Sequence, residues 1–543
     1  MTTGFFLFSI CFNLSFNMEW TEIERERLAK LEALRAEGID PYPPRVQFAK
    51  ERVMAADAIK QALALKSDGG PKTEDGNESG NRSPSLVSHP ETAPIAIMGR
   101  VVGKRVMGKA SFVHVEDGSA KIQFYARVGD DSIDVGSFAM FKELDLGDFI
   151  EARGPLFITK TGEPSLRVTA WRLLSKSVSP LPLAKEEKQP DGSVKRYSAF
   201  ASPELRFRQR YADLAVNPEV REVFWTRAKV IKAIREYFDN NGFLEVETPI
   251  LQPLYGGAAA RPFVTHHNEL NQDMYLRISF ELYLKRLLVG GIERVYEIGR
   301  DFRNEGVSYR HNPEFTQLEF YAAYWDLFDV MDFTEQFVQH AARAVLPEGK
   351  ATFRGHEIDF LQPWNRATLR DAILNATGID YKLYPDFDSL KAAIKAKGLE
   401  YSHSAKTWGK LVDGLMGDYV EKNLIHPTFL YEYPRDISPF AKSKVDEPNT
   451  VERFEGFMGG MELCNAFTEL NDPLDQAQRF LDEQKNAEGE EANPVDEDYL
   501  RSMRYGMPPN GGFGIGIDRL VMVMTGKDSI REVLLFPALR SDE

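Results

Sequence analysis

The segment RVYEIGRDFRNEGVSYRHNPEFTQLEFYAAYW, residues 294–325, says most about how this chain folds. It reads as two strands joined by a loop. The first strand ends at Arg303, the loop covers residues 304–313, and the second strand covers residues 314–324. Two strands separated by a short polar loop are typical of a hairpin, so the segment predicts one here.

Charged and aromatic side chains are concentrated in this hairpin. Because the side chains of a strand alternate between its two faces, Phe315, Glu319 and Tyr321 are expected on one face. Charged residues and a histidine crowd the loop and its flanks: Arg303, Glu305, Arg310, His311 and Glu314. Taken alone, this set fits a charged exposed turn as well as it fits a binding site.

A second segment, GFGIGIDRLVMVMTG at residues 512–526, reads as a strand that leads into a helix near Arg519. Gly512, Gly514 and Gly516 alternate along the strand, so one face is bare and a flat ligand can lie against the backbone. An arginine at the start of a helix is well placed to face an anion, aided by the helix N-terminus. Tight packing of helix against strand is the alternative explanation for the glycines.

A third segment, RFEGFMGGMELCNAFTELND at residues 453–472, carries the carboxylates of Glu455, Glu462 and Glu469. Carboxylates that converge beside phosphates hold Mg²⁺ through oxygen ligands, whereas ordinary surface glutamates are the alternative. The chain contains no G-x-x-x-x-G-K-[ST], H-E-x-x-H or G-x-S-x-G signature. P-loop phosphoryl transfer, zinc-protease and α/β-hydrolase functions therefore lose their support.

Composition narrows the possibilities further. The 543 residues are 43% hydrophobic and 27% charged, which is typical of a globular chain of about two to four domains. The formal net charge of −15 means that any nucleic-acid surface must be a local patch. With only Cys11 and Cys464, a disulfide scaffold and a cysteine-ligated metal centre within one chain are excluded, and a reducing compartment fits. No apolar run reaches the ~20 residues that a membrane helix needs.

The first third of the chain consists of segments that differ in composition and in hydrophobic pattern. Residues 19–37 predict one exposed amphipathic helix, and residues 67–94, rich in Gly, Ser, Asn and Pro, predict a flexible linker. The apolar run at residues 4–16 has no basic residue before it and no cleavage site after it, so initiation at Met18 is our hypothesis. Residues 95–174 show short alternating runs separated by turns, which predict a small closed five-stranded β-barrel.

Basic and aromatic side chains are interleaved in this barrel. They are Arg100, Lys104, Arg105, Lys109, Lys121 and Arg127, with Phe112, Phe124 and Tyr125. Cations for phosphates and ring faces for bases are what a single-stranded nucleic-acid surface needs. A plain barrel with core aromatics and solvated charges is the alternative.

Each segment alone is a modest signal, but together and in this order along the chain they are specific for one family. The chain closely resembles class II lysyl-tRNA synthetases from about residue 19 to residue 540. The run through Pro249 resembles motif 1 of that class, FRNEGVSYRHNPEFTQLE resembles motif 2, and GIGIDR resembles motif 3. The stretch YGGAAARPFVTHHNELNQDMYLRISFELYLKRLLVGG is similar to the lysine-specific family almost word for word. The resemblance implies an α+β fold, with an N-terminal OB-fold β-barrel followed by a class II catalytic domain built on an antiparallel sheet flanked by helices.

The resemblance also implies domain divisions. They are a non-native or disordered extension at 1–17, a helical segment at 18–66, the linker or insertion at 67–94, an anticodon-binding barrel at 95–180, a hinge at 181–210, and a catalytic domain at 211–543 with a helical insertion at about 327–450. The partners implied are tRNA(Lys), L-lysine, ATP and a second copy of the chain through motif 1. The location implied is the cytoplasm, without membrane attachment.

The reaction implied is ATP-dependent attachment of L-lysine to the 3′ end of tRNA(Lys) through a lysyl-adenylate, with release of AMP and pyrophosphate. The attacking carboxylate is already ionised, so alignment and charge neutralisation carry the catalysis.

By resemblance, the catalytic residues are Arg303, Arg519 and His311. ATP would be bound by Arg303, Glu305, Arg310, His311, Phe315, Glu462 and Arg519. Lysine would be bound by Gly257, Glu281, Arg303, Glu319, Tyr321, Asn465, Phe467 and Glu469. Mg²⁺ would be held by Glu455 and Glu462, and the anticodon by Arg105, Phe112 and Gln123.

The charges of the pocket favour lysine as the substrate. A buried ammonium needs opposite charge and full hydrogen bonding, which Glu281, Glu469 and Tyr321 supply. An aspartate enzyme would present a cation instead, so aspartate and asparagine are disfavoured. A paralogue that attaches lysine to a protein competes with this interpretation, but it would lack the barrel. A non-catalytic tRNA-binding protein competes with it too, but it would have lost motif arginines or metal glutamates.

Overall fold

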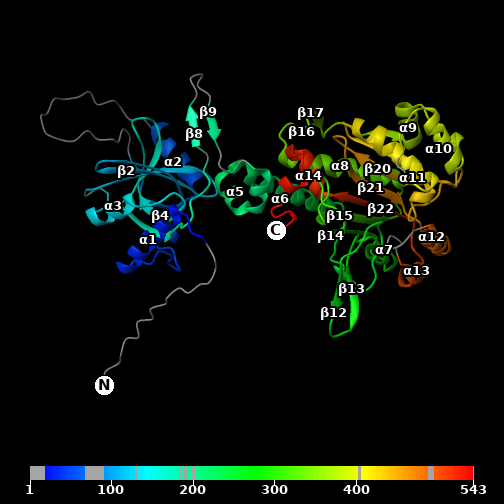
Figure 1. The fold of residues 1–543 in the computed structure, drawn as a ribbon, viewed down its shortest axis with the longest axis horizontal. Coiled ribbons are helices and arrows are strands. Elements are labelled where there is room, and N and C mark those ends of the chain that lie inside the picture. The colour runs from blue at the N-terminus through cyan, green and yellow to red at the C-terminus, as the bar shows by residue number, and fades with distance from the viewer. Residues whose placement is uncertain are drawn as a thin grey trace. The chain divides into compact units, whose positions relative to one another are not determined.

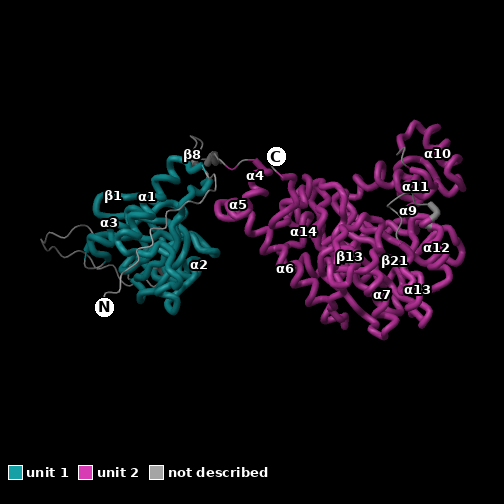
Figure 2. Tube along the Cα trace, turned by 60° about the horizontal axis from the view of Figure 1, so that its bottom comes forward, with its two compact units in different colours: residues 1–199 teal, residues 200–543 magenta. Residues whose placement is uncertain are grey.

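The computed structural model describes residues 19–67, 91–129, 132–183, 185–188, 194–197, 200, 202–401, 405–486 and 494–541. It contains two compact units, residues 1–199 and residues 200–543, coloured separately in Figure 2. The expectations for residues 1–17, and for most of the 67–94 linker, lie outside the described residues. Within the described ranges, no helix is long and apolar enough to cross a membrane.

Unit 1 combines helices with one sheet. Its helices are α1 (Glu22–Ala36), α2 (Ala55–Ser67) and α3 (Val135–Lys142), and its sheet strands are β1 (Ile95–Met107), β2 (Ala110–Glu116), β3 (Lys121–Arg127), β4 (Phe149–Gly154), β5 (Leu156–Ile158), β6 (Pro164–Arg167) and β7 (Ala170–Ser175). The predicted helix at 19–37 is α1, which begins at a capping box between Thr21 and Glu24. A short hairpin of β8 (Lys185–Lys188) and β9 (Val194–Tyr197) follows the sheet.

The sheet of unit 1 has seven strands in the order β5-β6-β3-β2-β1-β4-β7 rather than five in a closed ring. Prediction of a closed barrel was therefore wrong for the described strands, because β5 and β7 stand at the two edges. Pro155, which has no N–H to donate, separates β4 from β5. Since these consecutive strands sit near opposite ends of the order, the sheet must curve strongly around its core.

Unit 2 is built on an eight-stranded central sheet. In order across the sheet, its strands are β10 (Leu244–Glu245), β14 (Arg294–Phe302), β15 (Glu314–Ala323), β22 (Asn510–Gly516), β21 (Glu462–Thr468), β20 (Thr450–Phe457), β19 (Thr428–Pro434) and β18 (Asn365–Thr368). Neighbours are antiparallel except for the parallel pairs β10–β14 and β18–β19. The expected antiparallel sheet is thus confirmed.

One face of this sheet packs against α6 (Pro218–Asn240), α8 (Leu327–Val345) and α14 (Ile517–Thr525). Phe320 of β15 and Phe513 of β22 lie opposite each other on this face, with ring centroids 5.0 Å apart. Both are buried in the main core of the unit. Because neighbours along a strand face opposite ways, Glu319 and Gly514 must lie on the other face.

The remaining elements lie outside the central layers, and the β12–β13 hairpin (residues 264–276) projects away from the sheet (Figure 1). Helices α9 (Leu369–Thr377), α10 (Phe387–Ala396) and α11 (Trp408–Leu415) share a separate core. They fall within the expected insertion at about 327–450, but α8, β18 and β19 of that range belong to the central layers. The other elements are α4 (Pro203–Arg208), α5 (Arg210–Val216), β11 (Leu251–Gln252), β12 (Val264–His267), β13 (Gln272–Leu276), α7 (Glu281–Val289), β16 (Lys350–Phe353), β17 (His356–Asp359), α12 (Pro473–Asn486), α13 (Glu497–Met503) and α15 (Ile530–Val533).

Candidate active site

The site is built on the face of the central sheet that faces away from α6, α8 and α14. Strand register places its side chains in rows across β15, β22 and β21. One row is Glu319, Gly514 and Asn465, and the next is Tyr321, Gly512 and Phe467. The glycines in the middle strand leave the centre of this face free of side chains, as the alternating pattern predicted.

A cavity of about 420 Å³ lies over this face. Every residue of unit 2 to which a catalytic or binding role was assigned from the sequence lines it, except Glu455 and Glu469. Phe315, Glu319 and Tyr321 all contribute to the lining, so the prediction that they share one face of β15 is confirmed. Strand β15 ends at Ala323, one residue earlier than predicted, because Tyr324 adopts a positive φ of 67°.

One end of the cavity is basic. Arg519 on α14 lies with Nη1 2.9 Å from Oε2 of Glu462, and its Nη2 lies 3.2 Å from Nε2 of His311. Burial, followed by the charges of Arg519 and Arg310, lowers the pKa of His311. A neutral imidazole can accept a hydrogen bond from the guanidinium of Arg519, so the two groups form one array.

Arg303 is the basic group best placed for an anionic ligand. Its guanidinium lies 5.1 Å from the centroid of the Phe315 ring. Its Nε is buried and donates no hydrogen bond to any described residue. A buried donor without a partner is costly, so the guanidinium of Arg303 would gain from a nearby anion. Arg310, by contrast, forms an ion pair of 2.6 Å with Glu421, at the start of a short 3-10 turn.

The other end of the cavity is acidic. Glu319 is 3% exposed and accepts hydrogen bonds from Ser279 Oγ at 2.8 Å and Gln317 Nε2 at 2.9 Å. Tyr321 Oη also donates to it, at 3.2 Å. Burial, then the charges of Asp301 and Glu281, raises the pKa of Glu319 well above its ordinary value. This carboxylate is therefore firmly oriented and would gain from a nearby cation.

Glu281 and Glu469 meet at a buried lysine that the sequence had not singled out. Lys285, one turn after Glu281 on α7, donates to Oε1 of Glu281 at 2.7 Å and forms an ion pair with Glu469. Burial raises the pKa of Glu469 to about 8, opposed by Lys285. Burial disfavours the charge of Lys285, but the two carboxylates outweigh it and raise its pKa. Glu281 lines the cavity, whereas Glu469 lies behind it, 1% exposed.

Glu455 and Glu462 come from the neighbouring strands β20 and β21. Glu455 accepts a hydrogen bond from Tyr433 Oη at 2.9 Å and pairs with Arg453. Burial raises the pKa of Glu455 to about 7; Arg453 opposes this and the charge of Glu462 adds to it. Among the described residues, no group of three or more His, Cys, Asp or Glu is placed to hold a metal ion. Mg²⁺ is usually held by one or two carboxylates and substrate phosphates, so two mutually repelling carboxylates fit it.

Several residues that hold the site together escaped sequence reasoning. Arg277 is 2% exposed, and Nη1 of its guanidinium lies 2.5 Å from Oε1 of Glu297. Arg227 on α6 pairs with Asp518 at 2.5 Å, and Asp518 also accepts from the backbone N of Thr316 at 2.9 Å. The contacts of Asp518 join α6, α14 and β15 next to Phe315. No spacing pattern marks these residues, because each pair joins segments far apart in the sequence.

The surface of unit 1 that carries the proposed nucleic-acid residues is a face of β1, β2 and β3. Register places Arg105 opposite Phe112, and Phe112 opposite Tyr125. The guanidinium of Arg105 lies 5.9 Å from the Phe112 centroid, and the rings of Phe112 and Tyr125 are 5.1 Å apart. Gln123 lies on the same face, 6% exposed. Phe124 faces the core instead, and Tyr125 is only 4% exposed, so the alternative of buried aromatic residues holds for both of them.

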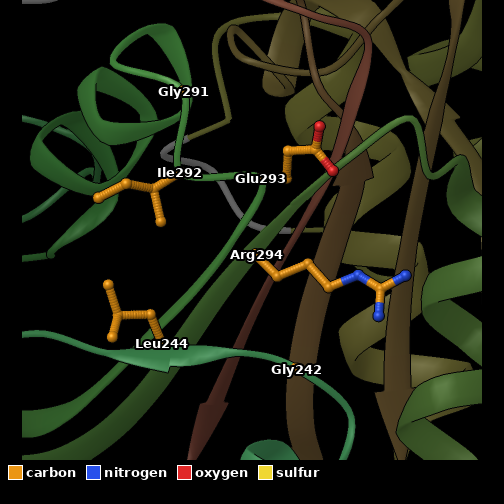
Figure 3. Close-up of a pocket in the computed structure, with 6 residues that line it drawn as sticks. All are labelled: Gly242, Leu244, Gly291, Ile292, Glu293 and Arg294. Atoms are coloured by element: carbon orange, nitrogen blue, oxygen red, sulfur yellow. The ribbon is translucent and has the colours of Figure 1, made fainter.

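A second cavity, of about 470 Å³, lies beside the edge strand β10. Its lining residues are Gly242, Leu244, Gly291, Ile292, Glu293 and Arg294. Figure 3 shows that Arg294 extends away from Leu244 and Ile292. Arg294 donates to the carbonyl of Asn241 at 2.8 Å, so this cavity offers fewer groups for chemistry than the first.

Comparisons with known proteins agree with this geometry. Residues 202–540 match the family model described as class II tRNA synthetases (D, K and N), and residues 95–174 match the OB-fold nucleic acid binding domain. The lysine–tRNA ligase of Dehalococcoides mccartyi is 46% identical over 524 residues, covering 96% of this chain and 98% of that protein. The lysine–tRNA ligase of Chloroflexus aurantiacus is 46% identical over 97% of this chain and 100% of its own length. That of Roseiflexus castenholzii is 47% identical, with the same coverage.

Proposed function

Because this chain belongs to the class II tRNA synthetase family and, within it, to the lysine–tRNA ligases, we propose that it attaches L-lysine to the 3′ end of tRNA(Lys) at the expense of ATP. The observation that carries the proposal is the polarity of the main cavity. One end holds Arg519 and an Arg303 whose Nε has no partner among the described residues, and the other holds the buried carboxylates of Glu281 and Glu319. A triphosphate and a lysine side chain need these two opposite environments.

In the first step, an oxygen of the lysine carboxylate attacks the α-phosphorus of ATP and pyrophosphate leaves. In the second, the terminal hydroxyl of tRNA attacks the carbonyl carbon and AMP leaves. Neither step needs a protein nucleophile, so alignment and charge neutralisation are sufficient. We assign the α-phosphate and the lysine carboxylate to Arg303, since it lines the cavity and its Nε has no hydrogen-bond partner among the described residues.

The nucleotide is assigned to the basic end of the cavity. Arg519 would hold the γ-phosphate, with His311 and Arg310 on the tail phosphates. The ring of Phe315 would stack on adenine, and Glu305 would read its amino edge. The contact between Arg519 and His311 supports this placement. It brings two nitrogen-bearing side chains together near the start of α14, where phosphate groups can bind.

The amino acid is assigned to the acidic end. Glu319 would accept the α-amino group, and the ammonium of the side chain would be met by Glu281 and Glu469 beside the Tyr321 hydroxyl. Asn465 and Phe467 would shape the wall. Gly257 adopts a φ of +86°, and an added Cβ there would lie 3.1 Å from Cβ of Glu281. A larger residue at that position would therefore be strained and would crowd Glu281.

Glu455 and Glu462 would hold Mg²⁺, which neutralises phosphate charge when bound. Each of these carboxylates is paired with an arginine, Glu455 with Arg453 and Glu462 with Arg519. The positive charges of the arginines offset the repulsion between the two carboxylates until a cation is bound. Unit 1 would bind the anticodon through Arg105, Phe112 and Gln123, and the reducing cytoplasm is the proposed location.

We also propose that the protein is a homodimer through the edge of the central sheet at β10. Leu244 on this edge is 51% exposed, and Leu251 nearby is 45% exposed. Leu244→Glu should halve the mass measured by light scattering after size exclusion. Leu474→Glu, at a residue 79% exposed on α12, is the matched control and should leave the mass unchanged. A dimer that survives Leu244→Glu would place the interface elsewhere.

The experiment that tests the function is amino-acid-dependent ATP–pyrophosphate exchange with each of the twenty amino acids. Lysine should support exchange and the other amino acids should not. Charging of tRNA(Lys) by the same preparation completes the test. Exchange with lysine but transfer only to a protein acceptor would favour the lysine-to-protein paralogue, and no exchange at all would favour a non-catalytic tRNA-binding protein.

A further inference from the structure

The buried ammonium of Lys285 occupies the same pair of carboxylates that the proposed function assigns to the substrate. Lys285 is 0% exposed, donates to Oε1 of Glu281 and forms an ion pair with Glu469. Its Nζ also lies 4.9 Å from the centroid of the Phe440 ring and 5.8 Å from that of Tyr321. A charged side chain so deeply buried keeps its charge only because both carboxylates compensate it.

Each carboxylate gives one oxygen to Lys285 and keeps the other. No described residue donates a hydrogen bond to Oε1 of Glu469. The hydrogen bond from Lys285 uses Oε1 of Glu281, and Glu281 itself lines the cavity. Gly512 makes room for the free oxygen of Glu469, because an added Cβ there would overlap it. One oxygen of each carboxylate therefore is not used by Lys285: that of Glu281 belongs to a residue that lines the cavity, and Oε1 of Glu469 is buried beside Gly512.

Lys285 changes the net charge of the pocket. Glu281 and Glu469 alone would bring two negative charges into a buried space, and one of them would take up a proton. With Lys285 and both carboxylates ionised, the three groups carry a net charge of minus one, and the raised pKa of Glu469, about 8, means that a proton neutralises this charge while no cation is bound. One incoming ammonium group then makes the cluster neutral, as a buried cluster should be.

We propose that Lys285 is a positioning residue for lysine recognition: it holds one oxygen of Glu281 and one of Glu469, sets the charge of the cluster at minus one, and leaves the other two oxygens for a single substrate ammonium. The inference rests on the proposed function, since it takes lysine as the substrate. It assigns specificity to a balance of charge and not only to the presence of acidic groups.

The test is a charge-balance series measured by lysine-dependent ATP–pyrophosphate exchange. Glu469→Gln leaves Glu281 and Lys285, a neutral pocket, and should raise the KM for lysine at least ~10-fold. The double variant Lys285→Met/Glu469→Gln restores a net charge of minus one, so its KM should fall at least ~5-fold below that of Glu469→Gln. The KM for ATP should stay within about twofold throughout, because no phosphate contact changes.

Rescue by removing a second group is the outcome that a merely structural lysine does not predict. If the double variant is no better than Glu469→Gln, the proposal is wrong. Lys285→Met/Glu281→Gln repeats the balance through the other carboxylate, in case one double variant fails to fold by circular dichroism. If both doubles fail to fold while Glu469→Gln folds, Lys285 is structural and the proposal is overturned.

Unit 1 offers a matched control. Lys176 is 5% exposed and bridges Asp145 and Asp148, so Lys176→Met removes a similar buried cation from the other unit. It should leave the KM for lysine unchanged; an increase equal to that of the site variants would attribute their effects to general destabilisation and overturn the proposal. Wild-type protein without lysine-dependent exchange would instead refute the proposed function, before any variant is compared.

Discussion

Gly512→Ala should damage lysine recognition while leaving ATP recognition intact. A Cβ at this position would lie 2.5 Å from Cε1 of Tyr321 and 2.8 Å from Cδ of Glu469, and closer still to Oε1 of Glu469. Neither neighbour can yield freely, because Tyr321 is 3% exposed and Glu469 is held by Lys285. Overpacking of this kind costs about 1–3 kcal/mol, and a carboxylate turned away from its buried partner loses about 1.5–3 kcal/mol.

The overpacking cost lowers the stability of the protein, whereas the loss of about 1.5–3 kcal/mol at the carboxylate, at about 1.4 kcal/mol per factor of ten, predicts a roughly 10- to 100-fold increase in the KM for lysine. Pyrophosphate exchange at varied lysine and varied ATP measures the two KM values separately. Gly516→Ala, four residues along the same strand, is the contrast. Its Cβ would lie 3.8 Å or more from neighbouring protein atoms, the nearest being those of Arg519, so the lysine pocket is undisturbed. This variant should raise only the KM for ATP. Gly414→Ala, with nothing within 4 Å, should change neither. A folded Gly512→Ala protein with unchanged KM for lysine would refute the reasoning.

Three further outcomes are expected. Glu469→Gln should raise the KM for lysine or lower activation at least ~10-fold in pyrophosphate exchange, since a buried charge-assisted hydrogen bond is lost; unchanged exchange would remove Glu469 from the site. Phe112→Ala should raise the KM for tRNA in charging and spare pyrophosphate exchange, whereas equal loss in both assays would contradict an anticodon role for unit 1. Burial raises the pKa of Asp301 from its ordinary 3.8 to about 7, so the folded state holds an extra proton between these values and the wild type loses stability as pH rises through them. The melting temperature of Asp301→Asn relative to wild type should therefore rise from pH 5 to pH 7 and then level off; a constant difference would mean that Asp301 ionises normally.

Local patterns were enough to predict the elements that carry the site. The hairpin at 294–325 appears as β14 and β15, and the glycine strand leads into α14 as expected. Helix α6 begins at Pro218, as expected from the preference for proline in the first helical turn. Resemblance then supplied what periodicity cannot, namely which of these charged residues would share one cavity.

Long-range pairing limited the sequence-based prediction elsewhere. The run FLEVETPIL through Pro249 is continuous in sequence, but Leu244–Glu245 and Leu251–Gln252 belong to different sheets. Lys285 looked like an ordinary helix residue, because its partner Glu469 comes from a distant strand end. Arg210 belongs to an alternating run of arginines, RFRQR, of the kind common on solvated surfaces, yet it is 2% exposed and pairs with Asp213 at 2.7 Å. Charge spacing alone does not show which ions a fold will bury.

The alternation along β15 links assembly of the core to competence of the site. Phe320 anchors the helices on one face, while Glu319 and Tyr321 form the cavity on the other. A shift of β15 by one residue in its register would place the phenylalanine side chain in the cavity and a carboxylate in the apolar core. A shift in register would therefore cost the core and the site together, so correct packing of this strand and assembly of the cavity occur in the same step.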